Sequence, residues 1–268
     1  MRMSTYADLI RYRELFGNLF RRDLQAKYRG SALGVLWTIA NPVLLMGVYL
    51  LVFSVVLDSR FGNVDHYPLF LLTGLAAWTF FATSLQSSAR SMLDNANLIR
   101  KTRFPRQLVP LSVVGAHLVS FAVMLVGLLV LNFALLPRVR DTEWLAIPFA
   151  VCFVALVAGL GLAVASLNVV FRDVEFIVGA LLLPWFFLTP VIYPLSGISG
   201  LERHHTVVQL LHWLNPVTPA IEALRSVLFV GSLPAWGDVV YLVVAAAVSL
   251  ALGAFVFSRV DDQIAIEV

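Results

Sequence analysis

The sequence predicts an all-α membrane protein with six membrane-spanning helices, and three observations support this fold class. Of the 268 residues, 60% are hydrophobic and only 13% are charged, which leaves too few polar side chains for the surface of a soluble domain. Six apolar stretches have about the 20 residues that a helix needs to cross a bilayer. Of the 19 Lys and Arg residues, 14 fall on one side of these stretches, and the basic side is the cytoplasmic one. We therefore expect a multi-pass protein with both termini in the cytoplasm.

Residues 1–32 precede the first apolar stretch and are expected to form an amphipathic helix. Basic side chains alternate there with apolar ones at helical spacing, namely Leu9, Tyr12, Phe16, Leu19 and Phe20. Such a helix lies in the plane of the membrane interface with its apolar side down. The alternative is a soluble amphipathic helix packed on another domain, but the rest of the chain is too apolar to supply such a domain.

One transmembrane domain, residues 33–268, holds the six expected spans. They cover residues 33–57, 68–89, 108–136, 145–167, 176–195 and 239–257. The fifth contains three prolines, so we expect it to break near its outer end. In the sixth, Ala245, Ser249 and Gly253 form a face of small residues. This face either packs closely against another helix or belongs to a generic apolar helix.

Two of the connections are expected to contain short helices. On the cytoplasmic side, residues 94–103 form a short basic helix that Asn95 or Asn97 caps. On the outer side, residues 207–214 and 219–230 form two short helices. We expect these two to dip partway back into the membrane, a re-entrant arrangement in which protein or water must cover the backbone.

Ionisable residues are missing from the expected spans. Their cores contain no Asp, Glu, Lys or Arg, and His117 is their only titratable group. Ion-coupled transporters keep such groups near the middle of the membrane, so ion coupling is not expected, and a single histidine is more typical of packing than of a proton relay. The chain also lacks the GxxxxGK[ST] loop that cradles phosphates. If the protein transports actively, its ATPase must be a separate chain.

Other kinds of site are not expected either. The basic residues follow the membrane topology and do not indicate nucleic-acid binding. Cys152 has no partner for a disulfide and is expected to be a small buried residue. No metal site is expected, because His204, His205 and His212 lack suitably spaced ligands. No catalytic residue is expected, because the carboxylates outside the spans are too sparse for a membrane-embedded transferase.

Four stretches, in this order, resemble signature stretches of the ABC-2 type permeases that export lipid-linked polysaccharides such as O-antigen, capsule and teichoic acid. They are RRDLQAKYRGSALGVLWTIANP (21–42), NANLIRKTRFPRQLVPL (95–111), NVVFRDVEF (168–176) and NPVTPAIEALRSVLF (215–229). The resemblance implies a bacterial cytoplasmic membrane protein that pairs with a second copy of itself. It also implies two copies of a separate nucleotide-binding subunit, which holds ATP and Mg, and a polyprenyl-linked polysaccharide as cargo. A permease for drugs or small lipids, and a passive channel, are the alternatives.

The resemblance further implies that residues 94–103 are the coupling helix that docks in the ATPase. The contact residues would be Asn95, Asn97, Leu98, Ile99, Arg100, Lys101 and Arg103. A short, capped, basic helix between two spans is suited to act as a rigid lever. The alternative is a basic anchor that only fixes the membrane topology.

The amphipathic helix would lie beside a lateral opening, where basic side chains would meet the diphosphate of the lipid-linked glycan. These side chains are Arg21, Arg22, Lys27 and Arg29. Guanidinium groups bind phosphate oxygens bidentately. Attraction to the anionic head groups of membrane lipids is the alternative for each residue.

Aromatic and polar residues of the spans are expected to line a conduit for the glycan, because the apolar face of a pyranose stacks on aromatic rings. The candidates are Trp37, Asn41, Trp78, Trp185, Phe187, Thr189 and Tyr193. Three of them, Trp185, Thr189 and Tyr193, fall on one stripe of the expected fifth span. For any single aromatic residue, an anchor at the membrane interface is the alternative.

Overall fold

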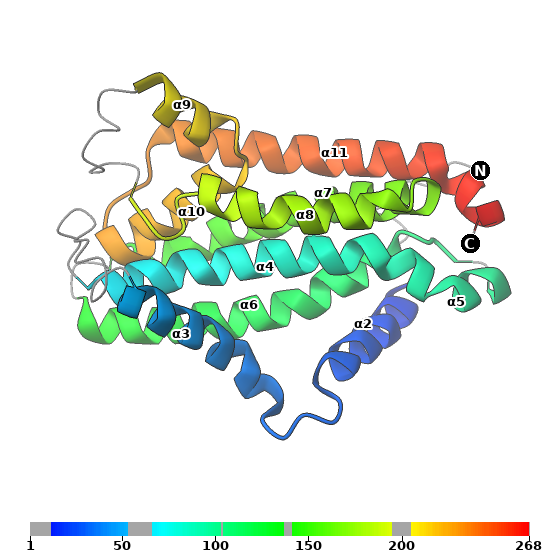
Figure 1. Cartoon of the computed structure of the whole chain (residues 1–268), viewed down its shortest axis with the longest axis horizontal. Helices are drawn as coiled ribbons and strands as arrows, with labels where there is room; N and C mark the ends of the chain where they lie inside the picture. Colours follow the sequence, from blue (N-terminus) through cyan, green and yellow to red (C-terminus); the bar gives the residue numbers. More distant parts are fainter. Residues whose placement is uncertain (1–11, 53–65, 103, 137–140, 195–204, 268) are drawn as a thin grey trace.

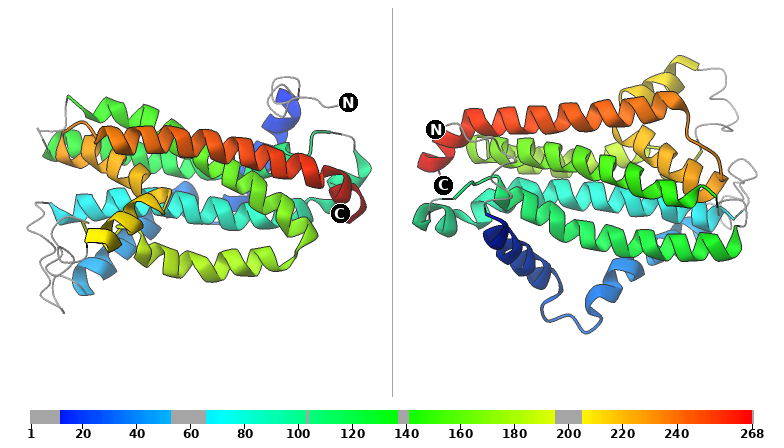
Figure 2. Two further views of the ribbon diagram at one scale, coloured as in Figure 1. Left: turned by 90° about the horizontal axis from the view of Figure 1, so that it is seen from above. Right: turned by 180° about the vertical axis from the view of Figure 1, so that it is seen from behind.

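The structure, a computed structural model, describes residues 12–52, 66–102, 104–136, 141–194 and 205–267. Within these residues it is built from helices and turns without a strand. Four helices are long and apolar enough to cross a membrane: α4 (Tyr67–Asp94), α6 (Leu108–Leu135), α7 (Ala146–Val170, preceded by the 3₁₀ turn η4, Glu143–Leu145) and α11 (Trp236–Glu267). They run along one axis as a bundle (Figures 1 and 2). Helix α4 is the most deeply buried of the four.

There are two shorter helices, α3 (Trp37–Leu50) and α8 (Asp173–Leu188); α8 runs along the same axis, whereas α3 is inclined to it (Figure 1). At about 1.5 Å per residue they rise only about 21 and 24 Å, less than the roughly 30 Å of the hydrocarbon layer. The fifth expected span is therefore shorter in the structure than predicted, and the helix of the first span begins at Trp37 instead of residue 33. The predicted end of the first span, at residue 57, lies outside the described residues.

The fifth expected span ends early because of proline. Helix α8 ends at Leu188, and the next residue, Thr189, is extended with ψ 134°. Proline disfavours the helical conformation of the residue before it, and Pro190 follows directly. The prediction that this segment breaks near its outer end is confirmed, but the helix stops seven residues before the predicted limit at 195.

Four other boundaries differ because a helix does not stop where the membrane stops. Helix α4 continues to Asp94 and α11 to Glu267, beyond the predicted limits of 89 and 257. The predicted loop at 168–175 shrinks to two residues, since α7 continues to Val170 and α8 begins at Asp173. Hydropathy marks the apolar part of a helix, whereas backbone hydrogen bonds carry the helix on through polar residues.

The predicted small face of the last span packs against α7. The Oγ atom of Ser249 donates a hydrogen bond to the carbonyl oxygen of Leu156 at 2.7 Å. A Cβ atom added to Gly253 would lie 3.1 Å from Cα of Gly159 and closer still to the carbonyl oxygen of that glycine. Because the two backbones approach this closely, close packing is the correct interpretation of the small face.

Replacing Gly253 with Leu should therefore destabilise the bundle. The added side chain must push α7 and α11 apart, and overpacking of this kind costs about 1–3 kcal/mol. We expect a lower unfolding temperature of the purified protein in detergent. Gly127→Leu in α6 is the matched control, because a Cβ atom there meets nothing within 4 Å. Equal unfolding temperatures for the two variants would contradict the close contact.

Helix α2 (Arg13–Tyr28) packs on α6 through its apolar side, where Leu19 is buried. The connection to α3 contains the 3₁₀ turn η1 (Gly34–Leu36), and the bend between α2 and α3 stands away from the bundle (Figure 1). Of the predicted helix in residues 1–32, the structure thus shows residues 13–28 as helical, and the location of this helix in the membrane interface stays a prediction. Its partner is a helix of the same bundle and not another domain.

The end of the bundle opposite α5 (Ala96–Lys101) holds the remaining short helices (Figure 1). They are α9 (His205–Trp213), α10 (Val217–Arg225) and the π-helical turn η6 (Ser226–Val230), and they replace the predicted ranges 207–214 and 219–230. Three apolar side chains of the second predicted helix are fully buried, as their spacing indicates: Ile221, Leu224 and Leu228.

Candidate functional site

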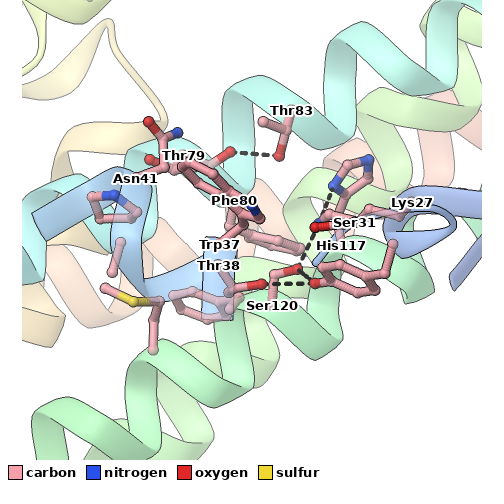
Figure 3. Close-up of a pocket in the computed structure, with 15 residues that line it drawn as sticks. Lys27, Ser31, Trp37, Thr38, Asn41, Thr79, Phe80, Thr83, His117 and Ser120 are labelled. Atoms are coloured by element: carbon pink, nitrogen blue, oxygen red, sulfur yellow. Dashed lines mark hydrogen bonds between the residues drawn. The ribbon is translucent and has the colours of Figure 1, made fainter. Parts of the chain in front are cut away.

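A pocket of about 240 Å³ lies where α2 turns into α3 and both meet α4 and α6. Figure 3 shows Lys27, His117 and Ser120 gathered at one side of this pocket, with Asn41 and Thr79 toward the other. The walls combine polar and aromatic side chains. The lining residues used below are Lys27, Tyr28, Trp37, Thr38, Asn41, Thr79, Phe80, His117, Ser120 and Phe121.

The polar side of the pocket is a connected hydrogen-bond network. The ammonium group of Lys27 donates to Oγ of Ser120 at 2.5 Å and to Nδ1 of His117 at 3.2 Å. Since an ammonium group can only donate, Nδ1 must accept, and His117 is neutral with its proton on Nε2. That nitrogen lies 3.0 Å from Oγ of Ser87 and donates to it.

Two further hydroxyl groups extend this network. The hydroxyl of Tyr28 lies 2.9 Å from Oγ of Ser120 and 2.7 Å from Oγ1 of Thr38. The network therefore joins the end of α2 to α3 and α6. Its members come from distant parts of the sequence, with Lys27 and His117 separated by 90 positions.

Lys27 carries the positive charge of the pocket. Partial burial lowers the pKa of Lys27, and the neighbouring Tyr28 partly opposes this shift. Among the described residues, the ion pairs are formed by other side chains, and the hydrogen-bond partners of Lys27 are neutral. A cation with neutral partners favours an anionic ligand.

The four basic residues of the predicted entry do not converge. Only Lys27 lines the pocket. Arg22 forms an ion pair with its neighbour Asp23 at 2.7 Å, and Arg21 and Arg29 are exposed outside the pocket. The side chains that complete the site, His117 and Ser120 among them, were not predicted from the sequence, because His117 was interpreted as a packing residue.

The seven residues of the predicted conduit separate into two groups. Trp37 and Asn41 line the pocket at the start of α3. The others lie around α8 and the segment that follows it, with Trp78 buried against Phe186 at a ring distance of 5.5 Å and Phe187 exposed. The structure therefore does not bring the seven residues together within this chain.

The predicted stripe of Trp185, Thr189 and Tyr193 is wrong, because α8 ends before Thr189. These residues make structural contacts instead. Nε1 of Trp185 donates to Oδ1 of Asn215 at 2.9 Å, and the amide nitrogen of Asn215 donates to Oγ1 of Thr189 at 2.8 Å. The Tyr193 hydroxyl donates to the carbonyl oxygen of Phe187 at 2.8 Å.

The predicted coupling helix is α5, which covers residues 96–101 of the expected 94–103. Ile99 is buried among apolar side chains of the bundle, and Nδ2 of the buried Asn95 donates to the carbonyl oxygen of Ser91 instead of capping α5. Leu98 is half-buried. The exposed residues of the helix are Asn97, Arg100 and Lys101, while Arg103 lies outside the described residues.

A buried arginine at the end of the bundle opposite α5 was not predicted from the sequence: Arg225 fell within the expected short helix 219–230, without a partner assigned to it. Only 1% of its surface is exposed. Its guanidinium donates to the carbonyl oxygens of Pro190 and Val191, and it stacks on the ring of Phe70 at 3.7 Å from the centroid. Oε1 of Glu222 lies 3.5 Å away. Arg225 thus ties α10 to α4 and to the segment after α8.

A glycine in α4 provides the space for this arginine. A Cβ atom on Gly74 would collide with the guanidinium of Arg225 and would lie 2.8 Å from the carbonyl oxygen of Val191. The sequence held one local signal of the buried pair, since Glu222 and Arg225 stand three positions apart on an otherwise apolar helix.

A second charged pair fixes α9 to the start of α11. Nε2 of His212 lies 2.5 Å from Oδ1 of Asp238. The hydrogen bond to Asp238 raises the pKa of His212, although partial burial opposes this shift, and the charges of Asp238 and Glu222 also raise it. Protonated His212 therefore strengthens the attachment of α9.

This pair predicts a pH dependence of the attachment of α9. Because the pKa of His212 is raised on folding, its stabilising contribution is complete below about pH 6.5, the ordinary value, and is lost as the pH rises through the higher folded value. The backbone amides of α9 should exchange hydrogen faster, after correction for the intrinsic rate, as the pH rises above about 6.5 in the wild-type protein. The His212→Gln variant should not show this acceleration. His66→Asn is the control and should show the same pH dependence of exchange in α9 as the wild-type protein. Exchange in wild-type α9 that does not change with pH would contradict the role of the His212–Asp238 pair.

Comparisons with known proteins agree with this helical architecture. The family model described as "ABC-2 type transporter" matches residues 14–229. The chain is 38% identical over 248 residues to the O-antigen export system permease protein RfbA of Myxococcus xanthus, covering 91% of this chain and 90% of the relative. It is 34% identical to a protein of the same name from Klebsiella pneumoniae, with 79% of each chain covered.

More distant relatives have related names. The polysialic acid transport protein KpsM of Escherichia coli is 22% identical, with 88% of this chain and 89% of the relative covered. The family model matches more than half of the chain, and the Myxococcus xanthus relative is more than 30% identical over most of its length. Together these two matches establish the family of the chain. The chain belongs to the ABC-2 type transporter family.

Proposed function

We propose that this chain is the membrane-spanning permease subunit of an ATP-driven exporter that moves a lipid-linked polysaccharide across the bacterial cytoplasmic membrane. The observation that carries the proposal is the similarity to an O-antigen export permease over about nine-tenths of both chains. Because the alignment covers nearly the whole of both chains, the similarity is not limited to one shared segment. A capsule export protein of Neisseria meningitidis, 25% identical over 96% of this chain, supports a polysaccharide as cargo.

In this proposal α3 and α8 complete six crossings. Helix α8 lies alongside the four longer helices and α3 runs obliquely to them (Figure 1), and both expose apolar side chains, such as Leu44 on α3 and Leu183 on α8. Each is short for a full crossing, so the residues that flank it would contribute the rest. The excess of Lys and Arg on the side of α5 supports a cytoplasmic location of both termini. A second copy of the chain would cover part of the exposed apolar surface of α8.

Helix α5 would receive the force from a separate nucleotide-binding subunit, which would hold ATP and Mg. Ile99 anchors the helix in the bundle, and the exposed Asn97, Arg100 and Lys101 would face the partner. Helix α5 connects α4 to α6 directly. A push on α5 would therefore act on two helices that line the pocket.

At the outer end, α9 and α10 would form a re-entrant gate that Arg225 and the pair of His212 with Asp238 hold closed. The aromatic residues beside this gate, Trp78 and Trp185, would meet the glycan once the gate opens. Sugars stack on such rings through their apolar faces.

Deletion of the gene tests the proposed cargo. Cells that lack the chain should make the lipid-linked polysaccharide but retain it inside, because the export route is missing. Surface glycan, measured by antibody labelling of intact cells and compared with the glycan of lysed cells, should return on complementation. Normal surface glycan in the deletion strain, together with loss of resistance to drugs, would instead favour export of drugs or small lipids.

A further inference from the structure

Asn168 joins three helices, α4, α7 and α8, at the end of the bundle that carries α5 (Figure 1). We propose that this side chain is a positioning residue, which ties the start of α8 to the end of α4 and so passes movements of α5 on to α8. The residue opens the stretch NVVFRDVEF (168–176), which lies outside the pocket, α5 and the proposed gate. This role rests on the proposed function, because it requires a nucleotide-binding subunit that acts on α5.

The side-chain amide of Asn168 bonds to two other helices at once. It is fully buried at the end of α7. Its Nδ2 donates to the carbonyl oxygen of Ala89 on α4 at 2.8 Å, and its Oδ1 accepts from the backbone N–H of Glu175 on α8 at 2.9 Å. A backbone carbonyl can only accept and a backbone N–H can only donate. An amide offers a donor and an acceptor on one short, planar group, so asparagine fits both partners.

The bond to Glu175 supplies a cap for α8. The first four N–H groups of a helix have no partner within that helix. Helix α8 begins at Asp173, and the side chain of the preceding residue, Arg172, does not cap it. Asn168 provides the acceptor from α7 instead. The first turn of α8 is therefore fixed to the same side chain that holds α4.

Two further contacts join the start of α8 to α4. Nε of Arg90 lies 3.3 Å from Oε1 of Glu175, and a Cβ atom on Gly179 would lie 3.4 Å from Oε1 of Gln86. The side chain of Arg90 is 59% exposed, and ion pairs at such exposure contribute little. The buried Asn168 is therefore the principal link between the two helices at this end.

The path from α5 to this link is short and well packed. Ala89 lies only five residues, about 8 Å, before the end of α4, and Asn95 alone separates α4 from α5. Ile99 of α5 belongs to the same apolar cluster as Met92 of α4 and Val169 of α7. A displacement of α5 would therefore move both of the helices that meet at Asn168.

Helix α8 can respond to such a displacement because it packs on the bundle through one stripe. Val178, Leu182 and Trp185 of this stripe contact the main apolar core. On the opposite surface, Ile177 and Leu181 are more than half exposed. This is the surface that a second copy of the chain would cover. A push on α5 would thus tilt α8 and reach the contact between the two copies.

Hydrogen exchange of the purified chain tests the tie itself. Asn168→Leu keeps a side chain of similar size but loses both hydrogen bonds, so the backbone amides around Glu175 should exchange at least about tenfold faster. Ser166→Ala is the matched control, because the buried Ser166 hydroxyl donates within α7, to the carbonyl oxygen of Ala163 at 2.9 Å. This control should keep the wild-type exchange of α8. Unchanged exchange in Asn168→Leu would overturn the tie, whatever the chain transports.

Movement of α8 in the complex with the nucleotide-binding subunit tests the coupling. Spin labels on Ile177→Cys of α8 and Phe255→Cys of α11, both exposed positions, are introduced in a chain with Cys152→Ala. ATP should shift the distribution of distances between the labels. Asn168→Leu should abolish this shift and lower surface glycan at least about tenfold, while copurification of the subunit and its ATP hydrolysis stay at the wild-type level. A merely structural role would instead lower copurification too.

The remaining outcomes separate this role from the proposed function. An ATP-dependent shift in Asn168→Leu equal to that of the wild-type protein, or loss of copurification in this variant, would overturn the coupling role. A wild-type chain that copurifies with no ATPase would refute the proposed function itself. If Asn168→Leu does not fold, Asn168→Asp decides at pH 8, where a carboxylate accepts from Glu175 but cannot donate to Ala89. This variant should keep slow exchange in α8 and still lose the shift.

Discussion

Replacing both Arg100 and Lys101 with Glu should reduce polysaccharide export by more than tenfold while the protein still inserts in the membrane. Both residues are exposed on α5, so the change reverses two charges, and lowers the net charge by four units, on the surface that would meet the nucleotide-binding subunit. Like charges across a protein interface cost several kcal/mol. Surface glycan and copurification of the ATPase should decline together.

The matched control reverses two charges elsewhere at the same end of the bundle. Arg172→Glu with Arg259→Glu makes the same change in net charge at two exposed residues outside α5. This control should retain export and copurification. If the control and the α5 variant lose export to the same extent, net charge or insertion is responsible, and the role of α5 as the coupling helix is wrong.

Replacing Arg225 with Met should give the largest loss of stability of any single change considered. The substitution leaves Glu222 without its cation and removes donors from the carbonyl oxygens of Pro190 and Val191. Loss of one partner of a fully buried ion pair costs about 3–5 kcal/mol; because the Glu222 side chain is 28% exposed, we expect the unpaired carboxylate to cost less than this range. We expect a much lower unfolding temperature in detergent and faster hydrogen exchange in α10.

A second substitution separates charge from packing. Arg225→Met combined with Glu222→Gln should recover part of the lost stability, because the unpaired buried carboxylate is gone. Arg225→Lys keeps the charge but cannot reach two carbonyl oxygens with a planar fork, so its unfolding temperature should fall between those of wild type and Arg225→Met. An Arg225→Met protein as stable as wild type would show that the buried contacts do not hold α10.

Features encoded by local patterns were predictable from the sequence. The span at 108–136 agrees with α6 to within one residue, and the buried face of α10 follows from the spacing of Ile221, Leu224 and Leu228. The small face around Ser249 is also local. In each case the periodicity of one helix decides which side chains meet a neighbour.

Features that depend on distant contacts were not predictable. The sequence near Arg225 does not show what buries it, because its guanidinium donates to carbonyl oxygens 34 and 35 positions away. The pocket escaped notice because Lys27 meets its partners 90 and 93 positions along the chain. Likewise, a helical stripe through Thr189 assumed that α8 continues, and Pro190 ends it.

Transport by reconstituted vesicles is the most direct test of the central claim. Inverted vesicles that hold this chain and its nucleotide-binding subunit should take up lipid-linked polysaccharide only with ATP and Mg, and the uptake should persist when proton and sodium gradients are abolished. The glycan inside would be measured by its protection from an added glycosidase. Uptake by this chain alone, driven by an ion gradient without ATP, would contradict the account.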